Sequence, residues 1–242
     1  YDSDCSNNAD CSTFYFGSSV VCQNAPTVNP TFSTKIQWVS DNQTANNSSM
    51  PAVGDVDGDG DPEVVSTNRS TNRLSILNGI TGETEKTIIV NPANGRYISH
   101  GVTIADVIPN SDPNDDTICA EIFVGGSYAQ GSVIAFDCNL NKLWEVQVPG
   151  RITGAISAAD FDQDGTPEIL VGTGIYNASD GSEIVAPSTP QYNNSLFGTI
   201  AFDILPFDAD DCVDCDGLEI VAGGVIYSVN IANGTKTEVR HI

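Results

Sequence analysis

The stretch PAVGDVDGDGDPEVVSTN, residues 51–68, decides the fold. It contains a short strand of small apolar residues that ends in Asp55, then an acidic loop, then Glu63 and a second, valine-rich strand. The same order recurs in ISAADFDQDGTPEILVGTG (156–174) and, with longer loops, in VTIADVIPNSDPNDDTICAEIFVGG (102–126) and IAFDILPFDADDCVDCDGLEIVAGG (200–224). Self-similarity at a spacing of a few tens of residues is typical of repeat architectures.

Two further strands follow in the repeats, for example at 73–77 and 84–90, and Gly/Asn/Asp turns separate them. Four short strands per repeat, without a helical period, are the pattern of a β-propeller blade. We therefore predict an all-β fold, a β-propeller of four-stranded antiparallel blades. About four blades are expected, at about 51–99, 100–150, 151–198 and 199–242.

The segment before the first blade contains a further expected strand. KIQWV (35–39) is similar to KLWEV (142–146), the fourth strand of the second blade, so we expect an outer, ring-closing strand at about 35–40. Four blades is the low end for propellers, so the chain is either a small ring or, as we expect, part of a larger propeller, with other domains in a longer chain. Residues 1–34 are interpreted as a Cys-containing linker or the end of a preceding module.

The acidic loops of the first and third repeats predict calcium sites. Oxygen-bearing side chains stand at alternate positions, and glycines allow the tight turn that brings them together. Calcium takes about six to eight oxygen ligands, and several carboxylates within nine residues repel one another without a cation. The predicted ligands are Asp55, Asp57, Asp59, Asp61 and Glu63 in the first loop, and Asp160, Asp162, Asp164, Thr166 (through its carbonyl) and Glu168 in the third.

The loops of the second and fourth repeats depart from this pattern. Fourteen residues separate Asp106 from Glu121 and fifteen separate Asp203 from Glu219, against seven in the regular loops. Calcium binding with altered ligands and remodelling to another role are both open for these loops. The candidate ligands there are Asp106, Glu121, Asp203, Asp208, Asp216 and Glu219.

The D-x-D-x-D-G-x-x-E loop between two strands resembles the FG-GAP/VCBS type of repeat, found in integrin α-subunit propellers and in bacterial secreted proteins. The sequence GDVDGDGDPEVV, followed by LNGITGE, is also similar to repeats of surface proteins of Bacteroidota-type bacteria. The resemblance covers nearly all of residues 51–242. It implies a calcium-stabilised propeller on the outside of a cell that binds a protein or glycan partner and serves adhesion or display.

Seven cysteines indicate an oxidising, extracellular setting. A hairpin register that pairs Val124 with Val133 places Cys119 opposite Cys138, within disulfide range. A local disulfide between Cys212 and Cys215 is favoured over a redox or zinc role, because the sequence has no second C-x-x-C or nearby histidine and the surrounding aspartates would raise the pKa of the thiols. The pairing of Cys5, Cys11 and Cys22 is left open.

Nine Lys and Arg against 32 Asp and Glu give a formal charge of −23, which disfavours nucleic acid and anionic membrane as partners. The sequence contains no stretch apolar and long enough to span a bilayer. Among common catalytic patterns there is no G-x-S-x-G, H-E-x-x-H, phosphate loop or dinucleotide fingerprint. No catalytic residue or organic cofactor is therefore predicted, and calcium is the expected cofactor.

Two functional classes are carried forward. The first is a non-enzymatic, extracellular binding, adhesion or surface-display module. The alternative is a secreted polysaccharide lyase or glycoside hydrolase on a propeller scaffold. An acidic-glycan lyase needs Lys, Arg, His and Tyr gathered around a substrate carboxylate, and nine dispersed basic residues favour the binding module.

Overall fold

The computed structural model describes residues 34–40, 50–93, 97–108, 119–126, 131–149, 152, 156–188, 199–204, 217–222 and 224–241. The chain divides into two compact units, Tyr1–Gln37 and Trp38–Ile242. All strands belong to the second unit, and the part of the chain that the structure describes contains no helix. The all-β prediction is confirmed. No helix long and apolar enough to cross a membrane occurs among these residues.

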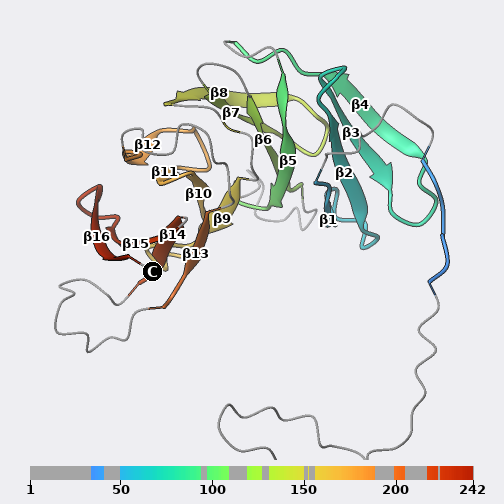
Figure 1. Cartoon of the computed structure of the whole chain (residues 1–242). Coiled ribbons are helices and arrows are strands. Elements are labelled where there is room, and N and C mark those ends of the chain that lie inside the picture. Colours follow the sequence, from blue (N-terminus) through green and yellow to red (C-terminus); the bar gives the residue numbers. More distant parts are fainter. Residues whose placement is uncertain are drawn as a thin grey trace, which may run out of the picture. The chain divides into compact units, whose positions relative to one another are not determined.

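The described residues form sixteen strands in four separate antiparallel sheets, each with four strands in chain order (Figure 1). Sheet 1 contains β1 (Ala52–Gly54), β2 (Glu63–Asn68), β3 (Arg73–Asn78) and β4 (Thr84–Ile89). Sheet 2 contains β5 (Ile98–Ala105), β6 (Glu121–Gly126), β7 (Gly131–Phe136) and β8 (Lys142–Val148). Sheet 3 contains β9 (Ser157–Ala159), β10 (Glu168–Val171), β11 (Gly174–Tyr176) and β12 (Glu183–Val185). Sheet 4 contains β13 (Ile200–Phe202), β14 (Glu219–Ala222), β15 (Val225–Asn230) and β16 (Thr235–His241).

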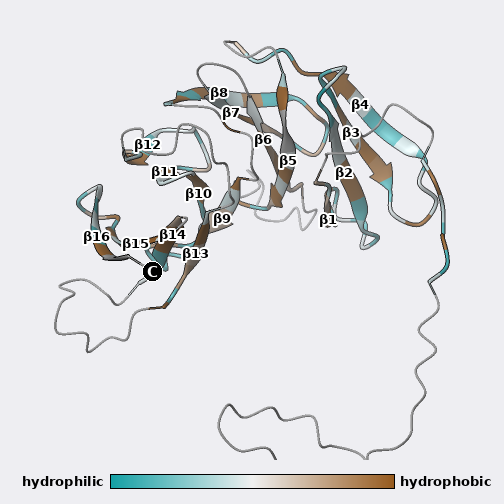
Figure 2. Cartoon of the chain, viewed as in Figure 1, coloured by the Kyte–Doolittle hydropathy of each residue, from teal (hydrophilic) through white to brown (hydrophobic). Residues whose placement is uncertain are grey.

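Hydrophobic clusters join consecutive sheets face to face. One cluster combines β2 and β3 of sheet 1 with β6 and β7 of sheet 2, a second combines sheets 2 and 3, and a third combines sheets 3 and 4. The alternation of side chains along a strand supplies both faces, since Ile122 packs toward sheet 1 and Phe123 toward sheet 3. Hydrophobic residues concentrate on middle strands such as β6 and β7, whereas the outermost strand β4 begins hydrophilic (Figure 2).

The outer strand predicted at about 35–40 is not formed, because residues 34–40 lie in no strand. Each of the four sheets already holds four strands of its own, so none offers this segment the place of a fourth strand. The segment is instead fixed at Trp38, whose indole Nε1 donates a hydrogen bond to the carbonyl of Gly79 at 2.9 Å. The residues predicted to form a linker, 1–34, lie outside the described residues except for the last.

The Cys119–Cys138 disulfide is confirmed, with 5.1 Å between the Cα atoms. The predicted register was wrong by one residue, since Val124 pairs with Ile134 and not with Val133. Both cysteines lie just beyond the ends of β6 and β7, where the ladder no longer fixes which residues stand opposite. The bridge therefore forms between flanking segments, and Cys138 N–H also donates to Cys119 Sγ at 3.3 Å.

Replacing Cys119 and Cys138 together with serine is expected to lower the free energy of unfolding by about 2–4 kcal/mol, since the bridge closes a 19-residue separation. Urea unfolding of the oxidised protein and the double variant measures the difference. Equal stability of the two proteins would show that the packing of sheet 2 alone holds the segments around Cys119 and Cys138 in place.

Candidate metal centre

A buried glutamate opens the second strand of every sheet. Glu63, Glu121, Glu168 and Glu219 are 2%, 4%, 7% and 1% exposed. Each accepts a hydrogen bond from the backbone N–H of the residue that follows the repeat's leading aspartate. The donors are Val56 (2.7 Å), Val107 (2.9 Å), Phe161 (2.8 Å) and Ile204 (2.9 Å). This contact ties the end of the first strand to the start of the second, whatever the length of the loop between them.

In the first loop, the carboxylate of Asp55 organises the backbone. Its Oδ1 accepts a hydrogen bond from Gly58 N at 2.7 Å, and its Oδ2 accepts one from Gly60 N at 3.1 Å. The φ angles of these glycines are 78° and 91°, a left-handed conformation that side chains oppose. The glycines of the sequence pattern therefore let the loop fold back over Asp55.

The third loop repeats this arrangement. Asp160 Oδ1 accepts a hydrogen bond from Asp164 N at 3.1 Å, and Asp160 Oδ2 accepts one from Gly165 N at 2.9 Å. Gly165 has a φ of 93°, and Gln163 has a φ of 60° at the position that Gly58 holds in the first loop. The two loops share one backbone design, although their sequences differ at this turn.

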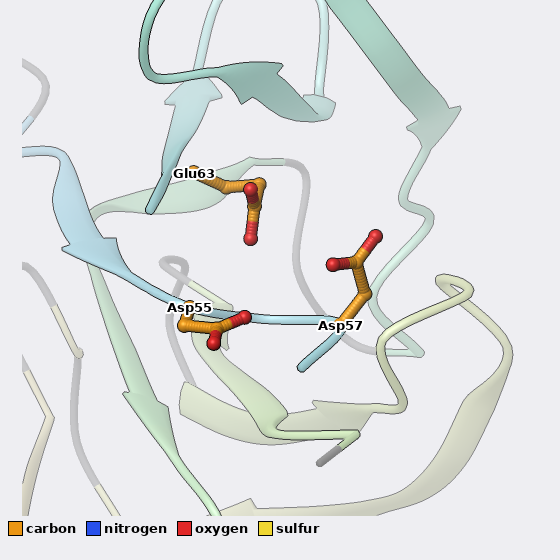
Figure 3. A group of neighbouring side chains, drawn as sticks. All are labelled: Asp55, Asp57 and Glu63. Atoms are coloured by element: carbon orange, nitrogen blue, oxygen red, sulfur yellow. The ribbon is translucent and has the colours of Figure 1, made fainter. Parts of the chain in front are cut away.

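Three carboxylates converge in each of these two loops. Oxygen atoms of Asp55, Asp57 and Glu63 all lie within 4.8 Å of one another, and Figure 3 shows the three side chains pointing into one space. Asp160, Asp162 and Glu168 form the equivalent group in the third loop. Such all-oxygen sets suit hard divalent cations, so the residues fit a metal ion.

Three other predicted carboxylate ligands, Asp59, Asp61 and Asp164, do not join these groups and are exposed. Thr166, predicted to bind through its carbonyl, is also exposed, and its role as a ligand stays a prediction. Two of the carboxylates make local turns, since Asp59 Oδ1 accepts from Asp61 N at 2.8 Å and Asp164 Oδ1 accepts from Thr166 N at 2.7 Å. The structure thus gathers the first, third and ninth positions of each loop, and places the intervening positions toward solvent.

The longer loops of the second and fourth repeats are described in part. Asp106 and Asp203 are exposed, and neither belongs to a carboxylate group among the described residues. Glu121 accepts hydrogen bonds from two backbone N–H groups, those of Val107 and Ile108. Asp208, Asp216, Cys212 and Cys215 lie outside the described residues.

The electrostatics of both groups favour a bound proton or cation. Burial raises the pKa of Glu168 to about 7, and the charges of Asp162, Asp160 and Asp164 add to the rise, against a smaller lowering by the Phe161 hydrogen bond. Burial also raises the pKa of Glu63, with Asp57 and Asp59 among the contributing charges. Each site therefore concentrates negative charge around a carboxyl group that is poorly solvated.

The sequence interpretation assigned the four glutamates to metal binding and missed their backbone role. A signal for that role was present, because a glutamate opens the second strand even in the two repeats with irregular loops. A residue needed only for the metal would not have to keep this place when the spacing of the other ligands changes.

No protein-family model matches this chain. No curated protein matches it. Solved structures that resemble it include an exotype rhamnogalacturonan lyase, YesX (18% identity, TM-score 0.49, 69% of this chain and 33% of that one), and a rhamnogalacturonan lyase, YesW (19%, 0.45, 76% and 45%). The biofilm matrix protein Bap1 of V. cholerae is similar at 19% identity and a TM-score of 0.47 over 84% of this chain and 33% of its own.

This chain thus spans a third to less than half of the length of these proteins. They comprise enzymes and a matrix protein. Similarities at these identities and TM-scores do not indicate an activity for this chain.

Glu121→Ala is expected to destabilise the protein by about 1–3 kcal/mol, because it leaves the N–H groups of Val107 and Ile108 without their acceptor. Glu121→Gln keeps an acceptor oxygen and should recover part of this loss. Urea unfolding with chelator present makes the comparison independent of metal. An alanine variant as stable as the parent would contradict the backbone role.

In metal-free protein, stability should fall as pH rises from about 4.5 to about 7. The folded-state pKa of Glu168 lies above its unfolded value, so its protonated form favours the fold at low pH and this contribution is lost as pH passes about 7. Thermal melts in chelator between pH 5 and 8 measure the slope. Glu168→Gln cannot titrate, so its slope should be shallower, and equal slopes would contradict this origin.

Proposed function

We propose that this chain is a calcium-stabilised segment of an extracellular β-propeller of the FG-GAP/VCBS type, and that it acts as a non-enzymatic binding, adhesion or surface-display module. The observation that carries the proposal is the pair of matching carboxylate groups, Asp55/Asp57/Glu63 and Asp160/Asp162/Glu168. They share spacing, hydrogen-bonding pattern and position between the first two strands of a sheet.

Contacts between sheets support a propeller arrangement. The first strand of each sheet touches the first strand of the next, since β5 contacts both β1 and β9, and β13 contacts β9. The sheets also pack face to face through apolar clusters. Blades of a propeller meet in this way, with their first strands gathered around the axis.

Calcium is favoured over a catalytic metal by the ligand set. Three carboxylates supply only part of the six to eight oxygens that calcium takes, and backbone carbonyls and water complete such sites. Asp55 and Asp160 already use both carboxylate oxygens to hold the loop backbone, so the ligands are part of the fold. An ion bound there would pin the loop and add its binding free energy to stability.

The basic residues favour binding over lyase chemistry. Lys86 Nζ donates to the carbonyl of Cys138 at 3.0 Å, Lys142 pairs with Glu145 at 3.2 Å, and Lys236 Nζ donates to the carbonyl of Ala186. Arg69 stacks on the ring of Tyr97, 5.2 Å from its centroid. These four cations make separate contacts in sheets 1, 2 and 4, whereas an acidic glycan at a lyase site needs cations that converge.

The disulfide supports an extracellular location. The Cys119–Cys138 bridge joins cysteines 19 residues apart in sequence, at the open end of the β6–β7 hairpin. Structural disulfides of this kind persist in oxidising compartments. A protein or glycan partner outside the cell is the expected ligand.

Calcium in hundredfold excess over its dissociation constant is expected to raise the melting temperature of chelator-stripped protein by about 5–10 °C per site. Asp162→Ala should lose the part of this rise in melting temperature that comes from the third loop, because it removes one of the three converging carboxylates. Differential scanning calorimetry with calcium or magnesium, together with elemental analysis, measures shift, selectivity and stoichiometry.

The matched control is Glu83→Ala, which removes one exposed negative charge from the turn before β4 and leaves both groups intact. It should keep the full calcium shift. An equal shift for Asp162→Ala and the parent would refute the third-loop site. Release of unsaturated products from acidic polysaccharides by the calcium-loaded protein would favour the lyase class over a binding module.

A further inference from the structure

The connections between strands differ in charge between the two ends of each sheet. Because the strands of a sheet follow in chain order with antiparallel neighbours, the first-to-second and third-to-fourth connections lie at one end. The second-to-third connection lies at the other end, where the fourth strand also finishes. The connections at the first end, which include the metal loops, hold 20 of the 32 Asp and Glu. The connections at the second end hold none, and we call it the acid-free end.

The acid-free connections are 69–72 (RSTN), 90–97 (VNPANGRY), 127–130 (SYAQ), 149–156 (PGRITGAI), 172–173 (GT), 186–199 (APSTPQYNNSLFGT) and 223–224 (GG). Their sequences contain three arginines and four aromatic residues among amides and hydroxyls. The whole chain has a formal charge of −23. An anionic ligand therefore meets the least repulsion at the acid-free end of a sheet.

An arginine and an aromatic ring of this end meet among the described residues. Arg69 directly follows β2 and Tyr97 directly precedes β5, and the guanidinium carbon of Arg69 lies 5.2 Å from the centroid of the Tyr97 ring. Tyr97 is 39% exposed, so part of its ring is open to solvent. Ser70 and Thr71, the next residues of the β2–β3 turn, are also exposed. One turn thus offers a cation, an aromatic ring and two hydroxyls.

Backbone contacts hold these groups in place without any ligand. The carbonyl of Asn72 accepts a hydrogen bond from Val90 N at 2.7 Å, and Asn72 Oδ1 accepts one from Ile98 N at 3.2 Å. The β2–β3 turn is therefore tied both to the residue after β4 and to the first residue of β5, next to Tyr97. A ligand at this turn pays little to order the site, which favours binding.

Glu145 is the acid that reaches this connection, and its charge is already satisfied. Its Oε1 accepts a hydrogen bond from Ala93 N at 2.7 Å, and its Oε2 pairs with Lys142 Nζ at 3.2 Å. The side chain of Glu145 is only 9% exposed. It therefore helps to fix the connection that carries Tyr97 and adds little repulsion toward an anion.

The groups on this turn suit a sugar that carries a carboxylate. A guanidinium has five N–H donors and binds a carboxylate through two parallel hydrogen bonds, so Arg69 can pair with a ligand and still lie over Tyr97. The apolar body of a tyrosine packs against the C–H groups of a sugar ring, and hydroxyls pair with its hydroxyls. A single turn with one ring matches one or two sugar units, whereas a specific protein partner covers about 800 Å².

We propose that the Arg69–Tyr97 pair and the β2–β3 turn form a binding site for an acidic glycan, a sugar chain that bears carboxylates. Arg69 pairs with a carboxylate, Tyr97 packs on a sugar ring, and Ser70 and Thr71 hydrogen-bond to sugar hydroxyls. The inference rests on the proposed function, because it names the partner class of the binding module. It does not rest on the metal sites, which lie at the other end of the sheets.

Isothermal titration calorimetry with tetramers of galacturonate, glucuronate and mannuronate tests the site, and a galactose tetramer is the neutral control. At least one acidic tetramer should bind, and the neutral one should not. Arg69→Gln and Tyr97→Ala should each weaken binding by about tenfold or more, and Arg69→Lys, which keeps the charge but not the paired donors, should weaken it less. Lys35→Gln removes the same charge from an exposed residue and should leave the affinity unchanged.

Each titration is run in chelator and in calcium, and the calcium shift in melting temperature is measured on the same samples. Glycan binding without a calcium shift would contradict the metal sites alone. Binding that requires calcium and is lost in Asp57→Ala would place the glycan at a metal loop and overturn this proposal. Equal binding of the neutral tetramer would overturn it too, as would unchanged affinity in Arg69→Gln.

Amide exchange of the unaltered chain keeps the test decisive if Tyr97→Ala does not fold. The bound tetramer should slow exchange at residues 69–72, and the neutral tetramer should not. If no acidic tetramer binds or protects these residues, the occupant is not an acidic glycan and the proposal is overturned.

Discussion

A buried carboxylate that accepts a backbone N–H at the turn from the first to the second strand is the contact on which every sheet depends. Glu63, Glu121, Glu168 and Glu219 make it in turn, and all are nearly inaccessible to water. A backbone donor at this place would be costly to leave unpaired, and a charged acceptor satisfies it strongly. Because the contact spans the loop, the loop itself is free to vary, and seven residues in one repeat become fifteen in another.

The same carboxylate links fold and metal. In the first and third loops, Glu63 and Glu168 use one oxygen for the backbone and stand beside two aspartates, the first of which accepts hydrogen bonds from loop N–H groups. Burial and the neighbouring carboxylates raise the pKa of each glutamate, so a cation bound there would offset an electrostatic cost of the fold. In the second repeat, Glu121 accepts from two backbone donors, and no such carboxylate group stands beside it among the described residues.

The features that could be predicted from the sequence are those that recur from repeat to repeat. The all-β class, the four-stranded repeat and the residues Asp55, Asp57 and Glu63 follow from pattern and spacing, because each recurs with the same local geometry. Features set by strand ends were not predictable in this way. The β6–β7 register differed by one residue, since Cys119 and Cys138 bond beyond the ladder, where no pleat fixes alignment. Asp59 and Asp61 face solvent on a turn in which Gly58 and Gly60 take left-handed conformations, a feature that the spacing of the acids does not encode.

Sheets 1 and 4, the first and last of the described sheets, each expose apolar side chains on the face that is turned away from the neighbouring sheet. In repeat architectures, a terminal member is usually capped by a polar outer face. Sheet 1 instead turns Val53 outward and sheet 4 turns out Ile200 and Phe202, the residue types that interior sheets bury. Each sheet is built with two apolar faces, so both end sheets carry the pattern of interior members. On the same faces, however, Ser75 and Leu77 of sheet 1 and Ile226 of sheet 4 are buried, so each face is exposed only in part.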